Sequence, residues 1–443
     1  MKKLDIKQVV DNNLCHSCGA CVPICHVNAI SFLQNNIGQY LPSIDYDICT
    51  ICCTLCYKVC PGININEKSV EYLSNLNDPF LGDTFNTLIG RANDPEIFHN
   101  AQSGGLVTQT LIYLMKKKEI RGALVVQGIS IDDKYTTNAY IATTPDEIIN
   151  SQHSKYIPTN LLVIAKKIEK LDYPIAVVGL SCHIHGLDNL INKNNRLIKN
   201  LKSNIKYKFG LICDGLFTYA AIDYFENKSK ITKIYDLIFR DKHNNNYIDA
   251  YTNIKGRTNN YLLKNNHRFQ LKEIIKPPRC RICFDKMNIF ADISFGDPWG
   301  IEGYDKKLGD SLIITRNKKG NHLIDKMLKD GAITAKIVSY SEAVNGQKIN
   351  FKKSEVLHFT EAYKSLGFKI PFVNEMIIKE NNININANNK FKAQKYISTF
   401  LELNKKDRKK IIKYIEKKIS FNLIRNKIKY IINKLLRIIY EKH

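Results

Sequence analysis

The sequence predicts a mixed α/β protein that begins with a small cysteine-rich module and ends in a basic helical tail. Three observations support this fold class. Nine of the 13 cysteines lie between Cys15 and Cys60. Short apolar runs then alternate with helical patterns, which is typical of α/β architecture. Residues 390–443, finally, carry 17 Lys and Arg against four Asp and Glu, which is over half of the chain's net charge of +24.

Length and composition bound the class of protein. At about 100–200 residues per domain, 443 residues suggest two to four domains. A hydrophobic content of 44% and a charged content of 24% exclude wholesale disorder. The sequence has no run of about 18 apolar residues that could span a membrane, and its first residues form no apolar signal segment. We therefore expect a cytoplasmic protein, in which grouped cysteines bind metal or carry electrons.

The first cysteine group has the spacing C-x2-C-x2-C-x3-C, from Cys15 to Cys25. Bacterial ferredoxins hold [4Fe–4S] clusters with this spacing, and the fourth cysteine binds the other of two clusters. His26 stands where a proline usually follows. Zinc is the alternative metal, but zinc sites usually place two cysteine pairs around a longer loop. The first group therefore predicts half of a bacterial-ferredoxin-like module.

The second group runs from Cys49 to Cys60 and ends in Cys-Pro, as ferredoxins do. It carries one residue more than the usual spacing, so that either Cys52 or Cys53 is its second ligand. Together the two groups predict two [4Fe–4S] clusters. One cluster is expected on Cys15, Cys18, Cys21 and Cys60, and the other on Cys25, Cys49, Cys56 and one of Cys52 and Cys53.

Four further cysteines lie far apart in the chain, at Cys182, Cys213, Cys280 and Cys283. Cys182 and Cys213 each follow a predicted strand, and strand ends are where α/β sheets commonly carry their sites. Four cysteines complete one cluster, which predicts a third [4Fe–4S] cluster here. Two alternatives stay open: a zinc site that includes His183 or His185, and small buried cysteines without metal.

Between the cysteine groups the pattern predicts the α/β region. A polar linker covers 74–86, and 106–118 has a helical pattern whose last lysines complement the helix dipole. Apolar runs bounded by turn residues predict strands. These strands cover 122–128, 173–179, 207–215 and 291–300.

The C-terminal part has a helical extension over 331–380, a linker-like segment over 381–390 and the basic tail over 390–443. An apolar face at helical spacing consists of Ile428, Ile431, Ile432, Leu435 and Ile439. A basic face precedes it, formed by Lys406, Lys410, Lys413 and Lys417. We expect this amphipathic tail to contact a membrane surface or an acidic partner, although charged segments are often only solvated.

Several segments together resemble a known family. They are 101–108 (AQSGGLVT), 154–156 (SKY), 179–186 (GLSCHIHG), and 279–300, which runs from RCRIC to ADISFGDPWG. In their order and spacing they resemble the beta-subunit family of coenzyme F-420 hydrogenases and dehydrogenases, over about residues 10–330. One departure is the family's Gly-Thr-Pro-Cys-Gln turn, which here is Gly-Leu-Ser-Cys-His at 179–183.

The resemblance implies an organisation and a chemistry. A ferredoxin-type domain would cover 1–68, and the two parts of the family region would cover 85–165 and 166–330. The family includes flavoenzymes that pair FAD with iron–sulfur clusters, and some members reduce coenzyme F-420. Similar chains also occur with bacterial surface-polysaccharide genes. The resemblance strengthens the prediction of a third cluster.

A flavin also suits the chemistry, because clusters pass single electrons whereas hydride acceptors take two. The first candidate FAD contacts are Ser103, Gly104 and Gly105 at a helix start, where backbone N–H groups suit a phosphate. Lys155 is a candidate positive charge. Gly296, Asp297 and Trp299 are further candidates in a glycine-bounded turn. Ordinary structural roles compete with these: a helix cap by Ser103, a surface lysine, and a turn packed by tryptophan. His183 and His185 are candidate proton donors.

The predicted function is that of an iron–sulfur flavoprotein oxidoreductase. It would move electrons between a ferredoxin-like donor protein and a small organic acceptor through FAD, with a link to surface polysaccharide synthesis. The alternative is a non-catalytic electron-transfer subunit that docks on a partner enzyme. No nucleic-acid-binding motif accompanies the basic charge, so nucleic acid is not an expected partner.

Overall fold

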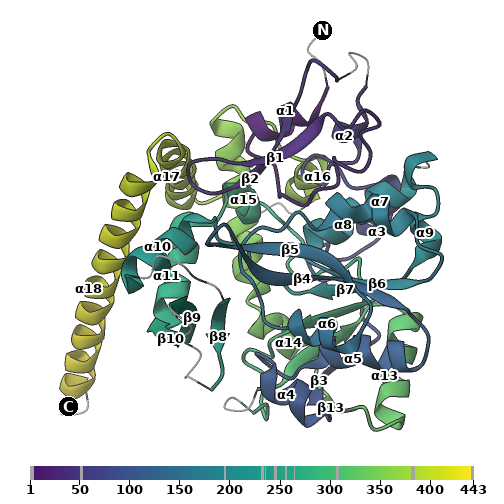
Figure 1. Ribbon diagram of the computed structural model, residues 1–443. Coiled ribbons are helices and arrows are strands. Elements are labelled where there is room, and N and C mark those ends of the chain that lie inside the picture. Colours follow the sequence, from purple (N-terminus) through teal and green to yellow (C-terminus); the bar gives the residue numbers. More distant parts are fainter. Residues whose placement is uncertain are drawn as a thin grey trace.

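The computed structural model shows a mixed α/β protein, as the sequence predicts (Figure 1). It describes residues 4–49, 53–193, 196–230, 234, 236–243, 247–254, 257–263, 265–305, 309–380 and 385–440.

An eight-stranded mixed sheet forms the centre of the molecule, in the order β13-β3-β12-β11-β7-β6-β4-β5. Its four middle strands, β11, β7, β6 and β4, are parallel, and the remaining neighbours are antiparallel. The strands are β3 (Asn86–Ala92), β4 (Gly122–Ile131), β5 (Lys134–Ala142), β6 (Ile175–Gly179), β7 (Ile205–Leu211), β11 (Ile293–Gly296), β12 (Ser311–Thr315) and β13 (Ile333–Ile337). Parallel strands end at the same edge, which gives the sheet one edge for a site.

Helices bury both faces of this sheet. One face packs against α5 (Leu106–Lys116), α6 (Pro145–Asn150) and α13 (Lys318–Lys329), with α4 (Pro95–Asn100) beside them. The other face is covered by α7 (Ala165–Glu169), α8 (Ser181–Asn192) and α9 (Leu201–Asn204), together with the short helices η1 (Leu161–Ile164) and η2 (Arg196–Ile198). Farther along the same face lie α14 (Tyr340–Gly346), α15 (Ile349–Ser365) and α16 (Phe372–Glu380).

The N-terminal module lies above this body (Figure 1). It consists of α1 (Ile6–Asp11), the hairpin β1 (Ile30–Gln34) and β2 (Tyr40–Ile44), α2 (Leu55–Lys58) and α3 (Glu67–Ser74). Helices from the far end of the chain hold it in place. Tyr363 Oη on α15 donates to the Asn13 carbonyl at 3.0 Å, and Ala393 and Ile397 of α17 (Ala387–Asn404) pack into the core of the module. The module is therefore part of the main body rather than a tethered domain.

A second packing unit joins the tail to the body. Helices α10 (Ala220–Ser229) and α11 (Asn265–Ile275) and a small antiparallel sheet lie beside the tail helix α18 (Arg408–Tyr440). The strands of that sheet are β8 (Asp236–Asp241), β9 (Tyr247–Ile254) and β10 (Arg257–Leu263). The short helix α12 (Pro278–Arg281) connects this unit to the sheet edge.

The predicted helix at 106–118 and the four predicted strands are present, with shifted ends. The structural alternative for Ser103, a helix cap, is not observed, because Gly105 is the N-cap of α5 with φ 73°, a conformation that glycine adopts without strain. Two local expectations are wrong. The expected helical extension over 331–380 contains a strand, β13, which pairs with β3 in the central sheet. Residues 387–390 are not linker, since the Asn386 side chain accepts a hydrogen bond from the Asn389 N–H and starts α17 there. Leu435 and Ile439 have side chains outside the described part.

Candidate metal centre

The carboxyl edge of the parallel strands brings chemistry-bearing residues together. Cys182 lies in the first turn of α8, directly after β6, and Cys213 follows β7. Asp297 follows β11. Because β6, β7 and β11 are neighbours in the sheet, three segments that are far apart in sequence meet at one edge.

The four distant cysteines lie close enough to affect one another's ionisation. Burial raises the pKa of Cys182 well above its ordinary value, and the neighbouring thiols of Cys18, Cys213, Cys283 and Cys280 raise it further. We call Cys182, Cys213, Cys280 and Cys283 the third quartet. Cys18 belongs to the N-terminal module, so this quartet adjoins the module directly.

Within the module, a first quartet consists of Cys15, Cys18, Cys21 and Cys60. Burial raises the pKa of Cys21, and the thiols of Cys18, Cys15 and Cys60 add to the shift. Burial and the Cys60 thiol likewise raise the pKa of Cys15 to about 12. These are the four cysteines that the ferredoxin spacing assigns to one cluster.

A second quartet lines one pocket, whose wall contains Cys25, Cys49, Cys53 and Cys56 among apolar side chains. Burial and then the Asp5 carboxylate raise the pKa of Cys56 to about 11. Of the two candidates for the second ligand, Cys53 lies in this pocket, whereas Cys52 lies outside the described residues. The pocket therefore places Cys53 beside the other three cysteines, and the choice between Cys52 and Cys53 stays a prediction.

Backbone N–H groups point at sulfur in all three quartets. The donors are 3.2–3.4 Å from their sulfurs: Ser17 N to Cys15, Ala29 N to Cys25, Gly62 N to Cys60 and Gly215 N to Cys213. Such bonds support thiolates and tune iron–sulfur clusters. Buried thiols with raised pKa values give up their protons only when a metal replaces them. The described residues contain no group of three or more His, Cys, Asp or Glu that could hold a single metal ion. The thiol environments fit clusters, in which each thiolate binds a separate iron.

Arg279 lies between the first and third quartets. Its side chain is 6% exposed, and its Nη2 donates to the Pro61 carbonyl at 3.3 Å. Its Nε and Nη1 have no hydrogen-bond partner among the described residues. A buried guanidinium with two unpaired N–H groups costs about 1–3 kcal/mol for each group. The anionic sulfur of bound clusters would supply the missing partners.

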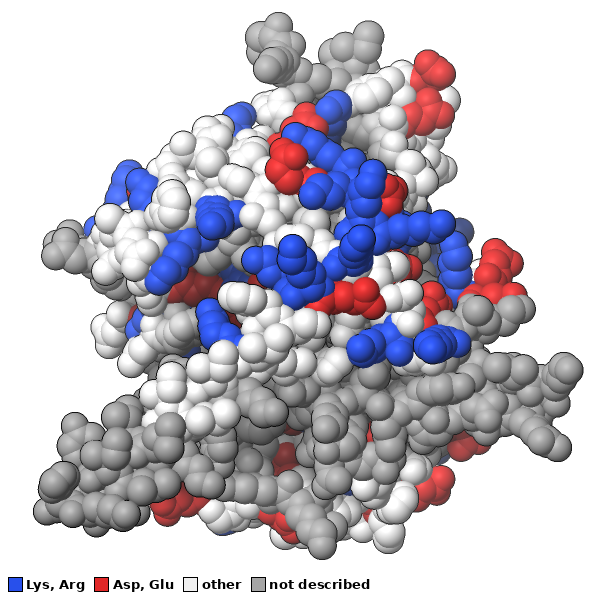
Figure 2. Space-filling model, turned by 90° about the vertical axis from the view of Figure 1, so that its left-hand side faces the viewer, with Lys and Arg blue, Asp and Glu red and all other residues white. Residues whose placement is uncertain are grey.

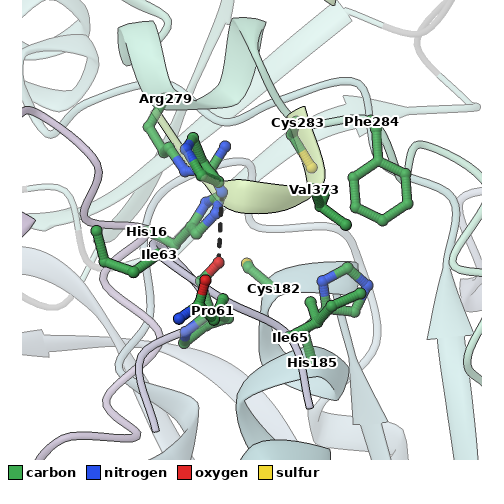
Figure 3. Close-up of a pocket in the computed structure, with 12 residues that line it drawn as sticks. His16, Pro61, Ile63, Ile65, Cys182, His185, Arg279, Cys283, Phe284 and Val373 are labelled. Carbon is green, nitrogen blue, oxygen red and sulfur yellow. Dashed lines mark hydrogen bonds between the residues drawn. The ribbon is translucent and has the colours of Figure 1, made fainter. Parts of the chain in front are cut away.

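Figure 3 shows the pocket into which Arg279 points. The module contributes His16 and Pro61 to its wall, and the body contributes Cys182, Cys283 and His185. Burial lowers the pKa of His16, and the nearby Arg279 charge lowers it further. The pocket is thus the junction between module and body.

A buried network of charges packs against the segments that carry the third quartet. Glu355 is 9% exposed and bonds to Lys352 at 2.7 Å and to Arg281 at 2.8 Å. Lys352 Nζ also donates to the Cys280 carbonyl at 2.9 Å. Lys272 pairs with Asp214, next to Cys213. The helix α15 therefore fixes the short helix α12, which carries Cys280.

The predicted FAD segments are linked by Arg240, which the sequence analysis missed. Arg240 Nη2 donates to Asp297 Oδ1 at 2.8 Å and to the Gln102 carbonyl at 3.3 Å. Its guanidinium lies 6.0 Å from the centre of the Trp299 ring. Gln102 Oε1 in turn accepts from the Ser154 N–H at 3.1 Å. The 101–105, 154–155 and 296–300 segments therefore meet around one arginine.

Other predicted contacts of this site have structural partners. Ser103 Oγ lies 3.1 Å from Ser311 Oγ, and the Gly104 N–H donates to the same oxygen at 3.0 Å. Lys155 is partly buried, and its ammonium group donates to the carbonyls of Ser151, Gln152 and His153. Burial lowers the pKa of Lys155 to about 7. Gly296 packs against Ile212.

The two histidines differ. His183 Nδ1 accepts from the Leu180 N–H at 3.2 Å, and its Nε2 lies 3.2 Å from the Thr159 carbonyl. Burial lowers the pKa of His183 to about 4, so it holds the start of α8 as a neutral ring. His185 faces the junction pocket and bonds through Nε2 to Asp285 at 2.8 Å.

Of the residues that the sequence analysis missed, Arg279 and Gln102 had a signal, because each lies inside a segment of the family resemblance. Arg240 had none. It lies on β8, in a region without cysteine or glycine patterns, and only the fold brings it to the site.

One cysteine quartet at the edge of an α/β sheet, beside a ferredoxin-type module that contains two more, is typical of an iron–sulfur protein of the oxidoreductase type. Sequence comparison identifies the family. Residues 87–166 match the N-terminal model and residues 173–340 the C-terminal model of "Coenzyme F420 hydrogenase/dehydrogenase, beta subunit". Residues 9–31 match a "4Fe-4S binding domain". The chain belongs to the coenzyme F420 hydrogenase/dehydrogenase beta-subunit family, which confirms the resemblance.

Relatives of this chain include subunits of oxidoreductases. The coenzyme F420 hydrogenase subunit beta of Methanococcus voltae is 26% identical, over 66% of this chain and 100% of its own length. The coenzyme F420-dependent sulfite reductase of Methanocaldococcus jannaschii is 25% identical over 83% of this chain, which spans 54% of that relative. A chain of the F420-reducing [NiFe] hydrogenase complex from Methanosarcina barkeri is 21% identical with a TM-score of 0.48, over 63% of this chain and 94% of that chain.

Proposed function

We propose that this protein carries electrons from a ferredoxin-like donor, through clusters in its three quartets and through FAD, to a small organic acceptor. The single observation that carries the proposal is the proximity of Cys18 to Cys182, which joins the first quartet to the third. The second quartet shares the module with the first, and Cys21 lies near Cys56. The quartets thus form a continuous series from the module to the sheet edge. We also propose the domain boundaries that the sequence predicts, with a ferredoxin-type domain over 1–68 and the two parts of the family region over 85–165 and 166–330.

We place the FAD contacts around Arg240. Gln102 Nε2 and Arg240 Nε are buried without a hydrogen-bond partner among the described residues. Unpaired buried donors beside a half-exposed Trp299 suit an anionic, aromatic ligand. When bound, FAD would exchange electrons singly with clusters and in pairs with the acceptor. Asp297 would orient Arg240 for this contact. Lys155 contributes only if it leaves its three carbonyls, so its role in binding stays a prediction.

The junction pocket suggests a proton path. His185 lies beside Cys182 and Cys283 in the pocket wall, and its Nε2 lies 2.8 Å from Asp285 Oδ2. We propose His185 rather than His183 as a proton donor, because backbone contacts occupy both ring nitrogens of His183.

The test is flavin and iron analysis of anaerobically purified protein. We expect about one FAD per chain in the wild type, and a loss of most flavin but no iron in Arg240→Gln. Arg408→Gln is the matched control, since it removes an Arg–Asp pair with Asp223 elsewhere. Flavin-free wild-type protein, or an Arg240→Gln variant that retains its flavin, would overturn the assignment.

The names of the relatives favour a second candidate, a non-catalytic electron-transfer subunit, because the Methanococcus voltae relative is a hydrogenase subunit. Turnover distinguishes the two. Isolated protein with an artificial electron donor should reduce coenzyme F420 or another two-electron acceptor if it is an enzyme, whereas an electron-transfer subunit should need a partner. The link to polysaccharide synthesis and the cytoplasmic location stay predictions. In either case we propose that the basic tail over 390–443 serves as a docking element.

A further inference from the structure

The tail helix α18 has one side that the protein covers. Ile411, Ile415 and Ile419 recur every four residues, are buried, and pack with α10 and α11 into one core. Polar contacts fix the same side: Arg408 pairs with Asp223, and Asn422 Nδ2 donates to Gln270 Oε1 at 2.7 Å. The first half of α18 is therefore held on the body, and the helix continues along one edge of the molecule (Figure 1).

The opposite side of α18 carries a single continuous stripe. Its members follow one another at intervals of three or four residues, which places them on one helix face. Three cations come first and apolar residues follow. The outer stripe consists of Lys410, Lys413, Lys417, Phe421, Ile424, Ile428 and Ile431. Its four apolar side chains are 60%, 60%, 52% and 47% exposed, in chain order. Contiguous exposed apolar side chains of this size mark an interaction surface.

Positive charge surrounds this stripe. Figure 2 shows Lys and Arg gathered on the side of the molecule where α17 and α18 lie. The exposed cations of these two helices and of the turn between them are Lys392, Lys395, Lys405, Lys406, Lys409, Lys410, Lys413, Lys417, Lys418 and Arg425. From 420 to 440 the sequence has five Lys and Arg and no Asp or Glu. The surface is therefore apolar and cationic, with little acid to balance it.

The charge decides between a second copy of the chain and a lipid surface as occupant. Two copies joined through their stripes would bring like charges together, whereas paired helices usually place opposite charges beside the apolar seam. An apolar helix face bordered by Lys and Arg complements an anionic bilayer: the apolar side chains enter the headgroup boundary and the cations face the lipid phosphates. No described helix is long and apolar enough to cross a membrane, so the contact would be at the surface.

We propose that the outer stripe of α18 binds an anionic phospholipid surface, with Phe421, Ile424, Ile428 and Ile431 inserted at the interface and Lys410, Lys413 and Lys417 on the headgroups. The proposal does not depend on the proposed electron path. It places the docking surface at the edge of the molecule, away from the junction pocket, so that a bound membrane leaves the module open to a donor.

Co-sedimentation of the full-length protein with vesicles tests this. Vesicles of phosphatidylcholine with phosphatidylglycerol should bind the protein at least about tenfold more tightly than pure phosphatidylcholine vesicles, since each cation near an anionic surface contributes on the order of 1 kcal/mol. The triple variant Lys410→Gln/Lys413→Gln/Lys417→Gln should lose most of this preference. Lys193→Gln/Lys199→Gln/Lys202→Gln is the matched control, because its three exposed lysines lie around α8 and α9.

Apolar insertion needs its own variants. Phe421→Ser/Ile424→Ser/Ile428→Ser should weaken binding at least about tenfold, whereas Ile337→Ser/Phe351→Ser, which changes two side chains that are 74% and 72% exposed elsewhere, should not. Circular dichroism and iron content establish that each variant is folded. Equal binding to both vesicle types, or no binding, overturns the proposal. So does a dimer in solution that the Phe421 triple variant dissociates, since the stripe would then face a second copy.

Discussion

The second and third quartets hold the same residue type in opposite surroundings. The second quartet lies within the 32 consecutive residues 25–56, and the wall of its pocket is largely apolar, with Val27, Ile30 and Ile44. The third quartet comes from three separate segments within residues 182–283, two of them after strands β6 and β7 and one around α12, and ionised groups surround it. The charge of Lys272 lowers the pKa of Cys213, and the charges of Arg279 and Lys352 lower that of Cys283, although burial raises both pKa values more strongly. A local loop builds the one site, and the sheet builds the other.

This difference has an electrostatic meaning. Four thiolates and a cluster carry negative charge, which increases when an electron arrives, so nearby cations favour the reduced form. Lys272, Lys352 and Arg279 should therefore raise the potential of a centre in the third quartet above that of the second. Electrons would then move from the module towards the sheet edge.

The largest test removes the third quartet. Cys280→Ser/Cys283→Ser should lower the iron content from about twelve to about eight per chain, because one [4Fe–4S] cluster is lost and two remain. Iron and sulfide analysis after anaerobic purification measures this. An unchanged iron content would show that the third quartet holds no cluster.

An effect of equal size is expected in the second quartet, but from one of two adjacent cysteines only. Cys53→Ser should remove about four irons, and Cys52→Ser should remove none, since Cys53 lies in the pocket wall. Iron loss in Cys52→Ser with retention in Cys53→Ser would reverse the ligand assignment.

Because buried ionised groups surround the third quartet, replacing one of them should destabilise the fold strongly. Glu355→Gln removes the carboxylate between Lys352, Lys276 and Arg281 and should lower the free energy of unfolding by about 3–5 kcal/mol, because buried cations lose their partner. Denaturant titration measures the change. The control Glu361→Gln breaks a partly exposed pair with Lys364 and should cost about 0.5 kcal/mol or less. Equal costs would mean that the network is not stabilising.

The same carboxylate predicts a dependence on pH. Burial alone would raise the pKa of Glu355, but Lys352, Lys276 and Arg281 lower it to about 2. Its stabilisation is therefore complete above the ordinary carboxyl pKa, near pH 4.5, and is lost as the pH falls towards 2. This amounts to about 3 kcal/mol at 1.36 kcal/mol per pKa unit. Unfolding curves between these pH values should show this component in the wild type and not in Glu355→Gln.

The smallest effect tests the electrostatic difference itself. Lys272→Gln should lower the potential of the third centre by on the order of 50 mV, since about 1 kcal/mol of charge interaction corresponds to that shift for one electron. Lys166→Gln is the counterpart, because Lys166 Nζ donates to the Cys25 carbonyl at 3.2 Å beside the second quartet. Potentiometry followed by EPR should find that each variant moves only its own centre. A shift of both centres in either variant would contradict the assignment.

The sequence predicts the cysteine quartets and the Arg240 site with different completeness, and the reason is physical. Loop spacing alone places Cys15, Cys18 and Cys21 around one centre, because two-residue gaps leave few conformations. Cys182 and Cys213 could be assigned to strand ends, but their neighbourhood depends on the strand order. Arg240 could not be found, because its role arises from the packing of the small β8–β10 sheet against the edge. The helix cap that competed with a cofactor contact at Ser103 is instead provided by Gly105, which uses backbone freedom rather than a side chain, and a side-chain pattern does not reveal such a cap.

The attachment of the N-terminal module to α15 and α17 has a consequence for biosynthesis. Asn13 leaves the ribosome long before Tyr363, which lies 350 residues later and bonds to it. At about 5–20 residues per second, the nascent module waits on the order of tens of seconds for the helices that cover it. During translation the thiols of the module are therefore exposed to oxidants and to competing metals. Delivery of iron and sulfide before the chain is complete would protect them.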